Sequence, residues 1–241
     1  MNVIITGCNR GIGLAILIKF ANEGWNIWAC VRKETEEFSE IISNLSESTG
    51  VRITPIYFDM TDDAEIKAGM KKIFDDKEPI HALVNNAGIG HYELFQRTSV
   101  ARGRELFNIN FFAPFQIMQY VLRKMERQGY GAVVNMSSIA SYWVNKGDGL
   151  YGASKAALSI LTRDVAAEYG GLNIRINAVA PGPTNTGMIE KYDKVGEAIY
   201  TNIAMKRLGH TEEIANAVYF LASEDASFIN GEVLTVDGGR C

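Results

Sequence analysis

The sequence predicts a doubly wound α/β fold, in which helices cover both faces of a parallel sheet of about seven strands. Short apolar runs rich in β-branched residues alternate along the chain with segments of helical periodicity. The runs are apolar at almost every position, which is typical of strands buried on both faces. The alternation has no linker, repeat or break in composition, so we expect one domain over residues 1–241.

The expected elements follow one another in a regular order. Strands are expected at residues 3–6, 25–31, 53–58, 82–85, 132–136, 174–179 and 233–236. Helices are expected between most of them, at residues 12–23, 37–45, 64–74, 104–128, 151–169 and 211–222. Right-handed crossovers should join the parallel strands. The long insertion after the sixth strand interrupts the alternation, and we expect it to form a substrate lid at about residues 183–206.

Composition and charge exclude several classes of protein. A hydrophobic content of 47% with 22% charged residues is typical of a globular chain. The net charge of −4 argues against binding to nucleic acid or to an anionic membrane surface. No apolar run reaches the length of a membrane span, and the turn at Gly7 comes too early for a signal peptide. The cysteines and histidines lack metal-ligand spacing, so we expect a cytoplasmic protein without a metal.

The first expected strand ends in a glycine-rich turn that suits a dinucleotide. Glycines permit a tight turn and let backbone N–H groups approach a phosphate at the positive end of a helix. The spacing G-x-x-x-G-x-G differs from the usual G-x-G-x-x-G, although strand, turn and helix follow in the right order. The alternative is an ordinary turn between a strand and a helix. We expect a Rossmann-type cofactor site that uses Gly7, Asn9, Arg10, Gly11, Ile12 and Gly13.

Charges after the second expected strand favour NADP(H) over NAD(H). A carboxylate at this place would accept hydrogen bonds from the free ribose hydroxyl of NAD. The chain instead has Arg32 and Lys33, with Arg10 in the glycine turn and no carboxylate before Glu34. Guanidinium groups suit the 2′-phosphate of NADP, which a carboxylate would repel. The alternative is that Arg32 and Lys33 are solvated loop charges.

Tyr151 and Lys155 form a candidate acid–base pair at the start of the helix expected at 151–169. Four residues make about one helical turn, so the two side chains share a face. An ammonium beside a phenol favours its ionised form, which would let Tyr151 exchange a proton near neutral pH. The same spacing begins at Tyr120 and at Tyr142, but the first lies in an amphipathic helix pattern and the second enters a glycine-rich loop.

With these features, the chain resembles the short-chain dehydrogenase/reductase family over essentially its whole length. The residues that carry the resemblance include Asn85-Asn-Ala-Gly88 after the fourth strand, Tyr151-Gly-Ala-Ser-Lys155, and Val236-Asp-Gly-Gly239 near the end. Within the family, the chain looks most like the 3-oxoacyl-acyl-carrier-protein reductases. The resemblance implies a reductase that converts a ketone to a secondary alcohol.

The resemblance also implies a catalytic tetrad of Asn110, Ser138, Tyr151 and Lys155. Tyr151 would donate a proton to the carbonyl oxygen, and Ser138 would hydrogen-bond that oxygen. Lys155 would hold the ribose of the cofactor and favour the ionised phenol, and Asn110 would keep a water in place for proton relay. Beyond the glycine turn, Arg32, Tyr151 and Lys155, the implied cofactor contacts are Asp59, Met60, Asn86, Ala87, Gly88, Pro181, Gly182, Thr184 and Thr186.

Several of these assignments have a competing interpretation. Ser137 is adjacent to Ser138, although the family's offset of thirteen residues to the tyrosine selects Ser138. Asn108 competes with Asn110, and either side chain could simply satisfy buried backbone groups. Asp59, which resembles the residue that meets the adenine amine, could instead only turn the chain.

The substrate and the assembly follow less directly from the sequence. A 3-oxoacyl thioester is the first expectation, yet Gly129 and Leu172 stand where relatives present basic residues to a carrier protein. Arg123, Lys124 and Arg127 lie close by in the sequence. The alternatives are a small polar, sugar or cyclic ketone, or a non-catalytic dinucleotide-binding regulator. The resemblance implies a homotetramer.

Aromatic and apolar side chains predict the lining of the substrate pocket or, alternatively, contacts between subunits. They come from the loop at 140–150 and from the lid, and are Tyr142, Trp143, Leu150, Met188, Tyr192 and Tyr200.

Overall fold

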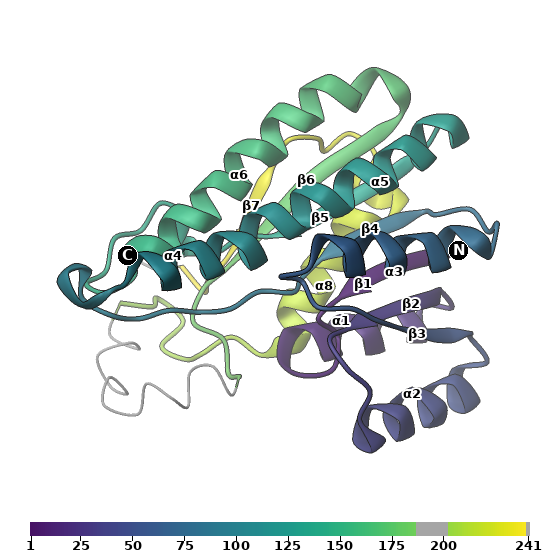
Figure 1. Ribbon diagram of the computed structural model, residues 1–241, viewed down its shortest axis with the longest axis horizontal. Helices are drawn as coiled ribbons and strands as arrows, with labels where there is room; N and C mark the ends of the chain where they lie inside the picture. The colour runs from purple at the N-terminus through teal and green to yellow at the C-terminus, as the bar shows by residue number, and fades with distance from the viewer. Residues whose placement is uncertain (187–201, 240–241) are drawn as a thin grey trace.

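A computed structural model of the chain describes residues 1–186 and 202–239. Seven parallel strands form one sheet in the order β3-β2-β1-β4-β5-β6-β7, so the doubly wound fold is confirmed (Figure 1). The order reverses between β1 and β4, and the crevice beyond the carboxyl ends of these strands is where such sheets bind ligands. The strands are β1 (Asn2–Thr6), β2 (Asn26–Val31), β3 (Ile53–Tyr57), β4 (Ala82–Asn85), β5 (Gly131–Met136), β6 (Ile174–Pro181) and β7 (Val233–Val236).

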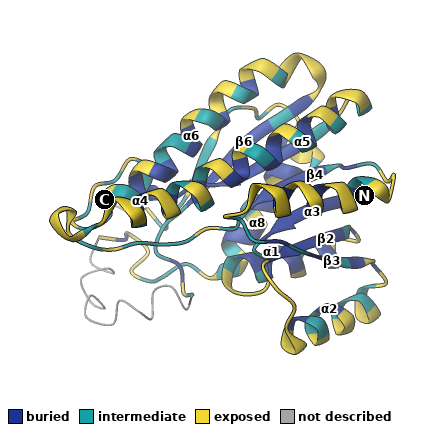
Figure 2. Ribbon diagram, in the orientation of Figure 1, coloured by how far each residue is buried: buried dark blue, intermediate teal, exposed yellow. Residues whose placement is uncertain are grey.

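Helices cover both faces of the sheet. One face packs against α1 (Gly11–Asn22), α2 (Glu36–Thr49) and α8 (Thr211–Ala222). The other face packs against α3 (Asp63–Asp75), α5 (Ala113–Gln128) and α6 (Gly149–Tyr169). The strands are buried between the layers, whereas the outer faces of the helices are exposed (Figure 2). Within the described ranges, no helix combines the length and the apolar character that crossing a bilayer requires.

Helix ends follow local signals in the sequence. The Thr35 hydroxyl accepts a hydrogen bond from the backbone of α2, and the Asp62 carboxylate accepts two from the first turn of α3. Gly50 and Gly129 follow α2 and α5 with φ of 73° and 78°, a left-handed conformation that glycine adopts without strain. These signals explain why most predicted boundaries agree with the structure.

The helix expected over residues 104–128 is present, but it begins earlier and contains a wider turn. The structure has α4 (Val100–Phe107), then the π-helical turn η2 (Asn108–Phe112), and only then α5. The Ala113 N–H donates to the carbonyl oxygen of Asn108, five residues earlier. Apolar residues continue through this segment, so periodicity does not reveal the wider turn. Such turns occur often at functional sites, and this one directs the Asn110 side chain into the interior.

The two edges of the sheet differ in how they resist pairing with another strand. Edge strand β3 carries Pro55, which has no N–H to offer to a further strand. Edge strand β7 has no proline, all four of its residues are at least partly exposed, and Phe228 before it is fully exposed. The β7 edge is therefore the one that a partner could cover.

The lid expected at 183–206 is described only at its two flanks. Thr184 and Gly209 form an isolated β-bridge across its base. Residues 187–201, and with them Met188, Tyr192 and Tyr200, lie outside the described residues.

Candidate active site

The turn after β1 forms a cradle whose shape requires glycine. Gly7 has φ of 66°, and an added Cβ would lie 2.8 Å from the Ala87 Cα atom. A Cβ on Gly13 would overlap the carbonyl oxygen of Gly7. Because α1 begins at Gly11, its unpaired N–H groups and positive end face the turn. Asn9 and Arg10 are exposed beside it, and Ile12 is half-buried. This cradle fits a pyrophosphate group.

The loop after β4 holds the cradle in place. The Asn86 amide donates to the carbonyl oxygens of Thr6 and Gly7 at 3.0 and 2.9 Å. The Thr6 hydroxyl accepts from the backbone N–H groups of Asn86 and Ala87, both at 3.0 Å. The structure therefore joins the predicted segments Gly7–Gly13 and Asn86–Gly88 at the point where the strand order reverses.

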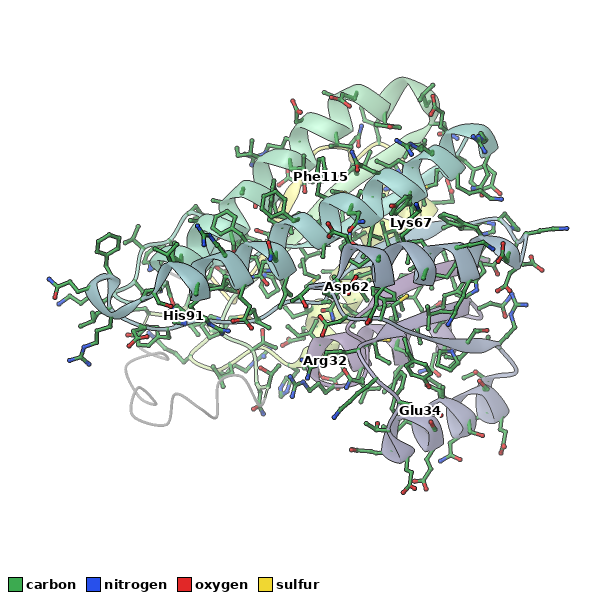
Figure 3. All side chains as sticks on the ribbon, viewed as in Figure 1. Arg32, Glu34, Asp62, Lys67, His91 and Phe115 are labelled. Carbon is green, nitrogen blue, oxygen red and sulfur yellow. The ribbon has the colours of Figure 1, made fainter. Side chains whose placement is uncertain are left out.

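Arg32 and Asp59 lie at the carboxyl ends of β2 and β3. Arg32 is exposed and directly follows β2 (Figure 3). The Asp59 carboxylate accepts from the Thr61 N–H and hydroxyl, both at 2.8 Å, which lowers its pKa, with a smaller contribution from the Arg32 charge. Asp59 does turn the chain before α3, as its competing interpretation expects. Met60 beside it is half-buried.

Tyr151 and Lys155 share one face at the start of α6. The Lys155 Nζ atom lies 6.0 Å from the centroid of the Tyr151 ring. The same ammonium donates to the Met136 carbonyl oxygen at 2.7 Å, at the end of β5. Lys155 is 4% exposed, and its burial lowers its pKa from 10.5 to about 8. Most molecules therefore carry the Lys155 charge at pH 7 and lose it above pH 8.

The Lys155 pKa predicts a distinctive pH dependence of stability. Below pH 8 the folded and the unfolded chain both carry the proton. Between about pH 8 and 10.5 the folded chain has released it and the unfolded chain has not, so stability rises with pH. We expect the free energy of unfolding of the wild type to rise relative to Lys155→Met by about 3 kcal/mol over this range.

Urea unfolding of both proteins at pH 7.5 and pH 10.5 measures this rise. The same substitution at exposed Lys67 provides the reference for a lysine outside the site (Figure 3). Parallel stability curves for the wild type and Lys155→Met would contradict the prediction.

The two serines after β5 make different hydrogen bonds. The Ser137 hydroxyl donates to the Ser159 hydroxyl at 2.6 Å, and Ser159 in turn donates to the Lys155 carbonyl oxygen at 3.0 Å, inside the core. The Ser138 hydroxyl accepts from the Ala140 N–H at 3.2 Å. In the described part of the chain this is its one hydrogen bond, which leaves the Ser138 O–H able to donate. This geometry favours Ser138 over Ser137.

Asn110 lies at the centre of the site, whereas Asn108 is exposed at the surface. The Asn110 Oδ1 atom accepts from the Ile89 N–H at 2.9 Å, and its Nδ2 donates to the Ile89 carbonyl oxygen at 3.0 Å. A Cβ on Gly88 would lie 3.2 Å from Asn110 Oδ1 and 3.3 Å from Lys155 Nζ. Both polar groups thus converge on Gly88, where a Cβ would fit only if they moved by a few tenths of an ångström.

The loop after β6 closes the crevice from the other side. The Gly182 N–H donates to the Val236 carbonyl oxygen at 2.9 Å, and a Cβ on Gly182 would lie 2.5 Å from that of Asp237. Pro181 is the last residue of β6, and the Thr184 hydroxyl donates to the Gly182 carbonyl oxygen. The Thr186 side chain lies 3.7 Å from where a Gly11 Cβ would stand, so this loop reaches the start of α1.

An apolar groove, separate from these residues, lies along α4 and its neighbours. Its volume is about 580 Å³, and its lining includes Phe95, Val100, Phe107, Phe112 and Leu150. None of the four tetrad candidates lines it. Of the expected pocket aromatics, Tyr142 is exposed and bonds through its hydroxyl to the Thr235 hydroxyl at 3.1 Å. The groove is therefore a surface feature of α4 and its neighbours.

Sequence reasoning missed two buried hydroxyl groups. Thr6 organises the loop after β4, and Ser154, inside the Tyr-Gly-Ala-Ser-Lys motif, accepts from the Asn110 Nδ2 atom at 3.1 Å. A polar residue at the end of an otherwise apolar strand was a usable signal for Thr6. The partner of Ser154 is 44 residues away, so no local pattern indicates it.

Comparison with known proteins agrees with this geometry. A family model described as Enoyl-(Acyl carrier protein) reductase matches residues 7–240. The chain is 36% identical over 240 residues to the 3-oxoacyl-acyl-carrier-protein reductase FabG of Thermotoga maritima, covering 98% of this chain and 96% of that one. It is 34% identical over 238 residues to a 3alpha-hydroxysteroid dehydrogenase of Mediterraneibacter gnavus, covering 98% and 94%.

Among solved structures, ElxO with NADP bound matches with a TM-score of 0.89 and 33% identity, covering 98% of this chain and 97% of that one. The family match and the alignments with the relatives extend over nearly the whole chain. In this chain, the motifs lie at the carboxyl ends of the strands. The chain therefore belongs to the short-chain dehydrogenase/reductase family of oxidoreductases.

Proposed function

We propose that the protein is an NADP(H)-dependent reductase that converts a ketone to a secondary alcohol, with Tyr151 as the general acid. The observation that carries the proposal is the convergence of Lys155 and Asn110 on Gly88, next to Tyr151 and beside the glycine cradle. The dinucleotide would be held by the cradle, the loop after β4, and the loop after β6. When bound, its nicotinamide would supply the hydride.

Each residue of the tetrad has a role that its surroundings support. Tyr151 would donate its proton to the carbonyl oxygen of the substrate. The Ser138 O–H would donate to the same oxygen and stabilise the charge that develops there. The buried Lys155 ammonium would stabilise the phenolate that Tyr151 leaves behind, because a charge acts strongly where water is excluded. Asn110 would hold the π-helical turn and a water for proton relay.

The cofactor preference rests on charge at the adenosine end. Arg10, Arg32 and Lys33 are exposed there, and the nearest carboxylate along the chain after β2 is that of Glu34. Guanidinium groups bind phosphate with paired, charge-assisted hydrogen bonds. The relative ElxO, described with NADP bound, supports the same preference.

Arg32→Ala should weaken the binding of NADPH and leave the binding of NADH unchanged. A hydrogen bond to a charged group contributes about 1.5–3 kcal/mol, so we expect the KM for NADPH to rise about 10- to 100-fold while the KM for NADH stays unchanged. Steady-state kinetics with both cofactors measures the ratio. Arg52→Ala, an exposed arginine before the amino end of β3, serves as the control. A wild type with a lower KM for NADH than for NADPH, or a variant in which both KM values rise equally, would overturn the NADP assignment.

The leading substrate is a 3-oxoacyl thioester, as the Thermotoga maritima relative supports. The hydroxysteroid dehydrogenase relative favours a cyclic ketone or alcohol as the second candidate. A panel of acetoacetyl thioesters, cyclic ketones and sugar ketones, assayed by NADPH oxidation, separates them. Thioester rates no higher than those of unrelated ketones would remove the leading candidate. Cofactor binding without any reduced ketone would favour a non-catalytic regulator.

We also propose a homotetramer, because two apolar surfaces are exposed. The first comprises four exposed apolar side chains: Val100 on α4, Phe112 in the turn η2, Phe115 on α5 (Figure 3) and Ile160 on α6. The second surface is the β7 edge with Phe228. Exposed apolar surface of this kind can mark a protein contact. We expect a mass near four times 26.6 kDa by sedimentation, and smaller species for Ile160→Asp. A monomeric wild type at micromolar concentration would contradict this assembly.

A further inference from the structure

Ser154 links the helix that carries Tyr151 to the π-helical turn that carries Asn110. Its side chain is fully buried. The Ser154 hydroxyl donates to the Tyr151 carbonyl oxygen at 2.7 Å and accepts from the Asn110 Nδ2 atom at 3.1 Å. Asn110 in turn is bonded through both atoms of its amide to the Ile89 backbone. One chain of hydrogen bonds thus joins the loop after β4, the turn η2 and the first turn of α6.

The opposite side of the same helical turn is held by close packing. A Cβ on Gly152 would lie 2.5 Å from the Ala140 carbonyl oxygen, in the short helix η3 (Ile139–Ser141) that Ser138 caps. This contact limits movement of α6 toward η3. On the other side, toward η2, the bonds of Ser154 limit it. The backbone of Tyr151 is therefore held between the two segments that carry Ser138 and Asn110.

We propose that Ser154 is a positioning residue for the reduction, an inference that rests on the proposed function. Its hydroxyl fixes the Tyr151 backbone against η2, and so keeps the phenol within hydrogen-bond reach of the substrate oxygen. Helix formation alone gives no reason for a serine here, because alanine is the better helix former and a serine bonded to the preceding turn slightly destabilises a helix. A misplacement of about 1 Å can reduce a rate by about a hundredfold, so such a link matters for catalysis.

Ser154→Ala tests the proposal, with Ser159→Ala as the matched control. Ser159 lies on the same helix, is buried, donates to the Lys155 carbonyl oxygen at 3.0 Å, and pairs with one other side chain. Both variants lose one buried hydroxyl with the same kinds of partner. We expect Ser154→Ala to lower kcat about tenfold at every pH, with the KM for NADPH within twofold. Ser159→Ala should keep kcat within twofold of the wild type and lower Tm by about as much as Ser154→Ala does.

Amide hydrogen exchange without cofactor or substrate gives a readout independent of activity. Ser154→Ala should speed exchange over residues 108–112, whereas Ser159→Ala should not. A kcat within twofold of the wild type in Ser154→Ala, an equal loss in Ser159→Ala, or unchanged exchange at 108–112 would overturn the proposal. If the wild type reduces no ketone, the proposed function fails while the exchange result still tests the link.

Ser154→Cys keeps the test decisive if Ser154→Ala does not fold. A thiol has similar volume and is a weak donor and acceptor, so we expect a loss of kcat of about threefold, between those of serine and alanine. A Ser154→Cys protein with unchanged kcat and unchanged exchange at 108–112 would also count against the link.

Discussion

We expect Tyr151→Phe to lower kcat for ketone reduction by about 10³-fold while changing the affinity for NADPH little, if Tyr151 is the general acid. A positioned proton donor contributes typically about 10²- to 10⁴-fold, and phenylalanine keeps the ring but removes the only proton that this position offers. The ring lies 6.0 Å from the Lys155 ammonium, so the phenylalanine retains the packing of the site and loses its acid. Single-turnover measurements of NADPH oxidation separate the chemical step from binding.

Tyr120→Phe is the matched control for this change. Tyr120 has the same four-residue spacing to a lysine, but it packs against the core on α5, far along the helix from Asn110. We expect its kcat to stay within twofold of the wild type. An unchanged rate in Tyr151→Phe with every accepted ketone would remove Tyr151 as the acid and favour the regulator hypothesis.

Gly13→Ala should abolish cofactor binding. The added methyl group would overlap the Gly7 carbonyl oxygen and lie 2.5 Å from the Asn86 Nδ2 atom. The turn or the loop after β4 must then move, and the N–H groups at the start of α1 no longer meet a pyrophosphate. At a concentration of 100 Kd, a ligand stabilises the wild type by about 2.7 kcal/mol, or about 5–10 °C in Tm for a chain of this size.

Thermal unfolding with and without NADPH measures this loss. We expect a shift below about 1 °C for Gly13→Ala at the concentration that saturates the wild type. Gly171→Ala is the control, because its added Cβ would meet no atom within 4 Å in the described residues other than its own and its chain neighbours'. A Gly13→Ala protein stabilised by NADPH as much as the wild type would show that the cradle does not hold the cofactor.

The two variants separate binding from chemistry. Tyr151→Phe should retain the thermal shift and lose the rate, whereas Gly13→Ala should lose both. Loss of the thermal shift in Tyr151→Phe would mean that the phenol also supports the cofactor.

Much of the fold follows from patterns within short windows of sequence. The ends of β4, β7 and α8 match the predicted residues because apolar runs and their bounding polar residues are local signals. The glycine turn was predictable for a related reason, since a chain that must bend tightly needs glycine at defined places. The pairing of Tyr151 with Lys155 required only the period of a helix.

The π-helical turn at Asn108–Phe112 could not be predicted in this way. Its apolar residues read as a continuous helix, and what favours the wider turn is a set of bonds from Asn110 to Ile89 and Ser154. These partners are 21 and 44 residues away in the chain. Likewise, the different roles of Ser137 and Ser138 depend on Ser159, which only the packing of α6 on β5 brings near.

The sequence by itself determined the order of strands and helices, the cradle, and the residue types available for proton transfer, because these depend on neighbours within a few residues. The tertiary structure decided which asparagine is buried beside Gly88, how Ser137 and Ser138 are hydrogen-bonded, how deeply Lys155 is buried, and that Ser154 joins two elements. These properties depend on desolvation and on hydrogen bonds between distant segments, and such contacts exist only once the helices have packed on the sheet.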